Sequence, residues 1–170
     1  MAATPKQTRG ARRYSLYIVA GARGSGKSSL INQMLSLQPP NEQWAVLLNE
    51  EGRTPIAANP TAETRVTVRS IAGACACCTG QLIFVTTLGT LIRQTRPDRV
   101  FVEASGDAAI DPLLHSVRSS FQDAVEIERV IVLPSPDARA AYTGPASDEV
   151  VVLDRWPNAL DAQALLESRT

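Results

Sequence analysis

Short runs of apolar residues alternate along this chain with segments whose apolar positions recur at helical spacing. The apolar runs predict strands at Tyr14 to Ala20, Trp44 to Asn49, Arg65 to Ser70, Arg99 to Ala104, Ile127 to Leu133 and Glu149 to Leu153. The helical spacing predicts helices at Lys27 to Leu37, Gln81 to Gln94, Asp111 to Phe121 and Ala159 to Glu167. This alternation is typical of an α/β fold in three layers, with a mostly parallel central sheet covered by helices on both faces.

The length and composition are those of one folded domain with a short tail. The chain has 170 residues, 44% of them apolar and 20% charged, and a domain usually takes about 100–200 residues. We expect residues 14–170 to form a single domain. Residues 1–13 contain Lys6, Arg9, Arg12 and Arg13 without an acidic residue, which predicts a disordered basic tail. A targeting or anion-binding arm is the alternative, although the tail lacks the apolar segment of a secretory signal.

Charge and hydropathy argue against two classes of partner. The 17 basic and 17 acidic side chains cancel to a net charge of zero, which removes the broad positive field that nucleic-acid binding uses. The uncharged run from Ser70 to Ile92 is long enough to cross a bilayer as a helix. It is rich in Ser, Thr, Gln and Gly, however, so a loop followed by a buried helix explains it better. We expect neither a nucleic-acid partner nor a membrane span.

A glycine-rich turn joins the first predicted strand to the first predicted helix. Its sequence, GARGSGKS over residues 21–28, matches the phosphate-binding pattern Gly-x-x-x-x-Gly-Lys-Ser in the strand–turn–helix context that this motif requires. The candidate nucleotide-binding residues are Gly21, Gly24, Ser25, Gly26, Lys27, Ser28 and Ser29. Backbone N–H groups would face the phosphates, Lys27 would neutralise the terminal phosphates, and the Ser28 hydroxyl would bind Mg²⁺. The alternative is a glycine-rich turn without a ligand.

An acidic residue at the end of another strand is the natural partner of such a loop. Glu103 follows the apolar residues 100–102, and the carboxyl ends of parallel strands meet at the edge of the sheet where ligands bind. We predict that Glu103 lies near the terminal phosphate and its metal and, with Lys27, forms the catalytic pair. From spacing alone, a solvent-facing carboxylate is an equally good interpretation.

All three cysteines lie in one short window, Cys75-Ala76-Cys77-Cys78. No distant cysteine is present to form a structural disulfide, so the cluster indicates metal or redox chemistry in a reducing compartment, and we expect a cytoplasmic protein. Thiolates on a tight loop suit Zn²⁺, Co²⁺ or Cu(I). Because Cys77 and Cys78 are adjacent, they cannot easily both face one ion. A coordination shell of two thiolates with other ligands is therefore favoured. Three buried small side chains and a redox pair are the alternatives.

These motifs together resemble the CobW-type P-loop metallochaperone GTPases, which are relatives of the nickel-insertion GTPases of urease and hydrogenase. Four blocks match in order. They are GARGSGKSSL at 21–30, LLNEEG at 47–52, GACACCTG at 73–80 and VEASG at 102–106. The resemblance spans residues 14 to about 114 and implies a P-loop NTPase fold. It also implies a nucleotide hydrolase that needs Mg²⁺. GTP is the family's nucleotide, and ATP is the alternative.

The resemblance further assigns roles to residues. It makes Asn49 and Glu50 a switch, Glu103 the Walker B acid, and Cys75, Cys77 and Cys78 a metal-binding loop that Glu50 completes. The implied function couples nucleotide state to the binding of Zn²⁺ or Co²⁺, or to its delivery to an apoprotein. A homodimer that shares one metal and a water-completed site are equally open.

The chain departs from this family in its base-recognition segment. The family reads guanine with Asn-Lys-x-Asp, and here Asp154 and Arg155 occupy the first two positions while Pro157 replaces the aspartate that accepts from the base. The family's C-terminal domain is also expected to be absent. A second hypothesis follows, in which the chain is a degenerate nucleotide- or metal-binding module that hydrolyses little and acts through a partner protein. The single histidine, His115, is predicted to be a surface or core residue rather than a ligand.

Overall fold

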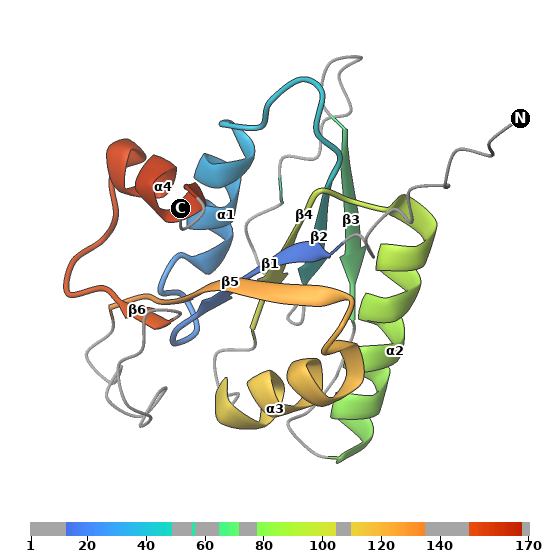
Figure 1. Ribbon diagram of the computed structural model, residues 1–170. Coiled ribbons are helices and arrows are strands. Elements are labelled where there is room, and N and C mark those ends of the chain that lie inside the picture. Colours follow the sequence, from blue (N-terminus) through green and yellow to red (C-terminus); the bar gives the residue numbers. More distant parts are fainter. Residues whose placement is uncertain are drawn as a thin grey trace, which may run out of the picture.

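The computed structural model describes residues 13–48, 56, 65–71, 78–104, 110–134 and 150–167, with the backbone alone at 78 and 79. Figure 1 shows strands alternating with helices along this part of the chain. The strands are β1 (Tyr14–Ala20), β2 (Trp44–Leu48), β3 (Val66–Ser70), β4 (Arg99–Glu103), β5 (Val125–Val132) and β6 (Val150–Val152). The helices are α1 (Lys27–Leu35), α2 (Cys78–Thr95), α3 (Ile110–Phe121) and α4 (Ala159–Leu166).

The strands form one sheet in the order β3-β2-β4-β1-β5-β6. Every pairing among the described residues is parallel, which confirms the predicted α/β fold. Glu103, the last residue of β4, lies in register with Val19 of β1 and with Leu48 of β2. Because parallel strands all end at the same edge, this register brings Glu103 next to the turn that follows β1.

Two apolar clusters fill the spaces above and below the sheet. Helices α2 and α3 cover one face, and α1 and α4 cover the other (Figure 1). Leu16, Ile18 and Val102 point into the first cluster, while Tyr17 and Val19 point into the second. This alternation is what a strand buried on both faces requires. The three-layer prediction is therefore correct.

Several predicted boundaries shift by one to three residues, as element ends usually do. Helix α1 ends at Leu35 rather than at Leu37, because the chain tightens into turns in which the Leu37 N–H donates to the Met34 carbonyl. Helix α2 begins at Cys78 rather than at Gln81. The prediction treated the Cys- and Gly-containing residues as a loop, whereas the buried stripe of α2 holds the helix on the sheet and its first turn extends back to Cys78. Strand β5 begins at Val125 rather than Ile127, because Val125 pairs with Tyr14 of β1.

Hydrogen bonds hold helix α4 at both ends, and this fixes the turn between α4 and β6. At its start the Asn158 side chain accepts hydrogen bonds from the Leu160 and Asp161 N–H groups, and the Asp161 carboxylate accepts from the Asn158 N–H. This reciprocal arrangement is a capping box. At its end the Arg99 guanidinium donates to the Leu166 carbonyl at 2.6 Å. The 154–158 turn is thus held between a strand and an anchored helix.

Some predictions fall on residues outside the described part. The predicted tail, 1–13, lies there except for Arg13. Among the described residues, no helix combines the length and the apolar character that a bilayer crossing requires.

Candidate functional site

The turn after β1 has the backbone conformation of a phosphate-binding loop. Gly21, Gly24 and Gly26 have φ values of 143°, 76° and 89°, which side-chain-bearing residues rarely adopt. Gly26 is the N-cap of α1, and its carbonyl accepts the first helical hydrogen bond from the Leu30 N–H at 3.0 Å. The loop therefore ends at a helix N-terminus, where unpaired backbone N–H groups and the helix dipole favour an anion.

The lysine of the motif is buried within its own loop. Lys27 is 3% exposed, and its ammonium donates hydrogen bonds to the Gly21 and Ala22 carbonyls, each at 3.1 Å. A buried cation is costly unless it is hydrogen-bonded, and the two carbonyls supply that compensation. The ammonium is thereby held against the backbone of its own loop, and the role of Lys27 in binding phosphate stays a prediction.

A serine and a glutamate meet beside the lysine. The Ser28 hydroxyl, on the first turn of α1, lies 3.0 and 2.9 Å from the two carboxylate oxygens of Glu103, to which it donates. The two residues are 8% and 3% exposed. The interpretation of Glu103 as a solvent-facing carboxylate is therefore wrong, because its side chain is buried against Ser28 at the start of α1.

The residues present fit a Mg²⁺-bound phosphate group. Mg²⁺ prefers oxygen ligands and is commonly bound by one or two protein oxygens together with phosphate, and the Ser28–Glu103 pair offers a hydroxyl and a carboxylate. The Ser25 hydroxyl is buried and has no hydrogen-bond partner within the described part of the chain, a condition that a bound polar ligand would relieve. A β-carbon built on Gly24 would meet nothing within 4 Å, so the loop is open there. Ser29, also predicted to bind nucleotide, is exposed on α1.

The turn after β6 lies against this loop through an unexpected residue. A β-carbon built on Gly26 would overlap the six-membered ring of Trp156, so the indole ring covers the α-carbon of the N-cap glycine. Trp156 is not among the residues that the sequence predicts to bind nucleotide, although its neighbour Arg155 is. Its signal was an aromatic residue inside the base-recognition segment, but the contact with Gly26 depends on how β6 and α4 place the turn.

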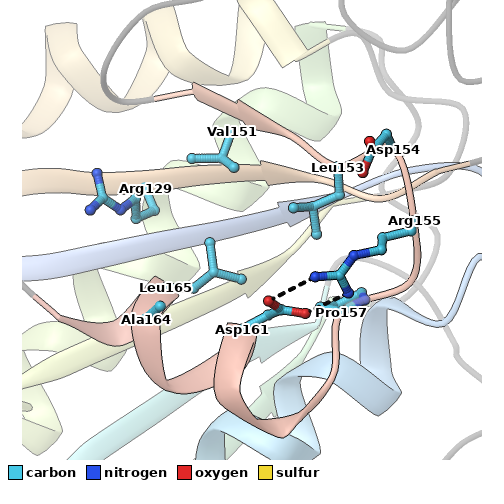
Figure 2. Close-up of a pocket in the computed structure, with 9 residues that line it drawn as sticks. All are labelled: Arg129, Val151, Leu153, Asp154, Arg155, Pro157, Asp161, Ala164 and Leu165. Atoms are coloured by element: carbon cyan, nitrogen blue, oxygen red, sulfur yellow. Dashed lines mark hydrogen bonds and ion pairs between the residues drawn. The ribbon is translucent and has the colours of Figure 1, made fainter.

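The two predicted base-recognition residues behave differently. The Arg155 guanidinium donates two hydrogen bonds, at 2.7 and 3.1 Å, to the Asp161 carboxylate of α4 (Figure 2). The hydrogen bond from Arg155 and a second from the Asn158 N–H lower the pKa of Asp161 below its ordinary value. Asp154 is exposed at the end of β6. Arg155 is thus directed to α4, and its role in nucleotide binding stays a prediction.

Comparison with known proteins identifies the family. Residues 15–149 match the family described as "CobW/HypB/UreG, nucleotide-binding domain". The chain belongs to this family. The expectation of a CobW-type nucleotide-binding domain is therefore confirmed.

Two curated proteins and one solved structure are similar to this CobW/HypB/UreG domain. A zinc chaperone named YeiR, from Escherichia coli, is 39% identical over 89 residues, which cover 52% of this chain and 27% of that protein. A zinc chaperone named CobW, from a Sinorhizobium species, is 25% identical over 159 residues, 88% of this chain and 45% of that protein. The chain thus spans less than half of either relative. A Zn(II)-bound triple mutant of the YjiA GTPase has a TM-score of 0.45 and 20% identity, over 72% of this chain and 40% of that one.

The predicted metal-binding residues of this CobW/HypB/UreG domain lie largely outside the part of the chain that the structure describes. Cys75 and Cys77 lie outside the described residues, as do the predicted switch residues Asn49 and Glu50, and at Cys78 only the backbone of the first turn of α2 is described. Within the described part no three His, Cys, Asp or Glu side chains are grouped to hold a metal ion. His115 is exposed on α3, in agreement with a surface residue.

A cavity of ≈ 320 Å³ lies between β6 and α4 on the side of the sheet that carries α1 (Figure 2). The side chains that line the cavity include apolar residues of both elements and several charged residues. The lining residues are Arg129, Val151, Leu153, Asp154, Arg155, Pro157, Asp161, Ala164 and Leu165. Since the Arg155–Asp161 pair forms part of this lining, the same ion pair borders both the turn and the cavity.

Proposed function

We propose that this chain is a Mg²⁺-dependent nucleoside-triphosphate hydrolase that couples its nucleotide state to the binding or delivery of Zn²⁺ or Co²⁺. GTP is the nucleotide that its family implies. The observation that carries the proposal is the Ser28–Glu103 pair, buried beside Lys27 at the edge of the sheet where β1 and β4 end. A hydroxyl, a carboxylate and a cation grouped around a helix N-terminus suit a metal-bound triphosphate.

Each group in the nucleotide site has a separate task in this proposal. Backbone N–H groups of residues 21–28 bind the phosphates, and Lys27 neutralises charge on the terminal phosphates. Ser28 and Glu103 hold Mg²⁺, which when bound neutralises phosphate charge. The Glu103 carboxylate also orients the attacking water and accepts its proton, directly or through a water molecule.

The sheet order supports coupling between the nucleotide and the cysteines. Strand β2 lies between β4 and β3, and at their ends Leu48 is in register with both Glu103 and Ser70. The chain after β2 contains Asn49 and Glu50, and the chain between β3 and α2 contains Cys75 and Cys77 and leads directly to Cys78, the first residue of α2. Neighbouring strands are about 4.8 Å apart, so the two segments leave the sheet at adjacent positions. A triphosphate that orders the first segment can thereby change the metal affinity of the second.

The proposed metal ligands are Cys75, Cys77 and Cys78, with Glu50 as a further ligand. Thiolates bind Zn²⁺ and Co²⁺ well, and both curated relatives are named zinc chaperones, which favours zinc. A reducing compartment such as the cytoplasm would keep the thiols available. An apoprotein would receive the metal, and a homodimer would complete the shell if two copies share one ion.

A second candidate is a binding module that hydrolyses little and acts through a partner protein. The turn at the position where the family recognises guanine favours the binding module. Pro157 offers no hydrogen-bond acceptor from its side chain, and Arg155 is paired with Asp161. The two candidates differ in Mg²⁺-dependent phosphate release from bound nucleotide. Multiple turnover favours the enzyme, and stable binding without phosphate release favours the module.

The cysteine assignment predicts a selective loss of metal affinity. Cys77→Ser should weaken Co²⁺ or Zn²⁺ binding by at least about tenfold, because it replaces a soft thiolate ligand with a neutral hydroxyl. Nucleotide affinity should change less than about threefold. His115→Ala is the matched control, since it removes the chain's single imidazole from an exposed position on α3 and should leave both affinities unchanged. Competition with a chromophoric chelator measures the metal affinity. Equal losses of metal and nucleotide affinity in Cys77→Ser would show instead that the loop is structural.

A further inference from the structure

An aromatic side chain stands exposed beside the phosphate-binding loop. Trp156 is 41% exposed although its six-membered ring covers Gly26. Gly26 is the N-cap of α1, the point where the loop presents its backbone N–H groups. A nucleotide whose phosphates occupy this loop therefore brings its ribose and base toward the surface that carries Trp156.

Two polar side chains of the 154–158 turn, those of Arg155 and Asn158, are already hydrogen-bonded to α4. Both ends of the Arg155 guanidinium fork are bonded to Asp161, and the Asn158 side-chain oxygen accepts from two backbone N–H groups. Pro157 is buried and has no side-chain donor or acceptor. Selection of guanine needs an acceptor that faces the two N–H groups on one edge of the base. Among the side chains of residues 155–158, none offers an acceptor that is not already hydrogen-bonded, and the exposed carboxylate of Asp154 lies before them at the end of β6.

Aromatic stacking provides binding without that selection. Every nucleobase has a π-face, so contacts with an aromatic ring tolerate any base. We propose that the nucleobase is held by stacking on Trp156 and is not read at its edge, so that the site binds nucleoside triphosphates without selecting the base and does not favour GTP over ATP. This inference rests on the proposed function, because it concerns the base of the same bound nucleotide.

Direct titration of the full chain with Mg²⁺-GTP and Mg²⁺-ATP tests the proposal. Tryptophan emission is the readout, because a stacked base changes the environment of the exposed Trp156. The second tryptophan, Trp44, is fully buried at the amino end of β2, the opposite edge of the sheet from the loop, and contributes a constant background. The two dissociation constants should agree within about threefold, because stacking is insensitive to base identity. A preference for either nucleotide of about a hundredfold or more would overturn the proposal.

Substitution of Trp156 separates stacking from an effect on the loop. Trp156→Ala should weaken GTP and ATP by about the same factor, roughly tenfold, whereas Trp156→Phe should retain most of the affinity. Mg²⁺-pyrophosphate, which has no base, should bind wild type and Trp156→Ala equally well. Leu160→Ala, which truncates a 76% exposed side chain of α4, is the control and should bind both nucleotides like wild type.

The outcomes also distinguish this inference from the proposed function. A parallel loss of pyrophosphate affinity in Trp156→Ala would show that the ring only supports the loop and would overturn the stacking role. Loss of one nucleotide alone would show that the base edge is read, with exposed Asp154 as the acceptor to test by Asp154→Ala. A wild-type chain that binds pyrophosphate, GTP and ATP too weakly to measure would contradict the proposed function itself.

Discussion

Lys27→Ala should lower the affinity for Mg²⁺-nucleoside triphosphate by at least about a hundredfold. The ammonium is buried over the loop and held there by the Gly21 and Ala22 carbonyls. Hydrogen bonds to charged groups contribute about 1.5–3 kcal/mol each, so the loss of two such contacts to phosphate oxygens corresponds to about that factor. Equilibrium binding of a fluorescent nucleotide measures the change.

The control for Lys27→Ala removes a cation without touching the site. Arg93→Ala deletes an exposed positive charge from α2, on the opposite face of the sheet from α1, and should bind nucleotide like wild type. Thermal unfolding of both variants checks that the fold is kept. Unchanged nucleotide affinity in folded Lys27→Ala would contradict the assignment of the phosphate loop.

Glu103→Gln should slow hydrolysis by about a hundredfold or more while nucleotide binding changes only a few-fold. The amide keeps an oxygen that can accept from the Ser28 hydroxyl but loses the negative charge and the ability to take a proton. General base catalysis by a positioned side chain contributes about 10²–10⁴-fold to the rate. Single-turnover phosphate release at saturating nucleotide isolates this step from binding.

The matched control for Glu103→Gln is Glu126→Gln on β5. It makes the same chemical change at a side chain that is 56% exposed, and its rate should equal that of wild type. A wild-type rate in Glu103→Gln would mean that another group takes the proton. A rate of zero in both wild type and variant, with nucleotide bound, would instead support the binding module.

The fold could be predicted from the sequence because the strands appear as clear apolar runs and the helices as apolar positions at helical spacing. Nearly continuous apolar runs such as Trp44 to Leu48 become central strands buried on both faces. The start of α2 was harder to predict, since Cys78, Thr79 and Gly80 have no strong helical preference and join the helix because its buried stripe is anchored on the sheet.

Those parts of the candidate site that a local sequence motif specifies could be predicted. The parts that depend on contacts between distant segments could not be predicted with certainty. The glycines and Lys27 follow from one octapeptide whose geometry is local. The role of Glu103 depends on the neighbouring positions of β1 and β4, which spacing along the chain does not reveal. The contact between Trp156 and Gly26 joins segments that are far apart in the sequence and escaped prediction for the same reason.

One titration tests the central claim, that nucleotide and metal binding are coupled. The reduced, metal-free protein is titrated with Co²⁺ while thiolate-to-metal absorption is followed, without nucleotide and with Mg²⁺ and non-hydrolysable analogues of GTP or ATP. Nucleotide should tighten Co²⁺ binding by about tenfold, within the usual range of allosteric coupling. Thiolate binding of Co²⁺ with the same affinity in all three titrations would contradict the claim.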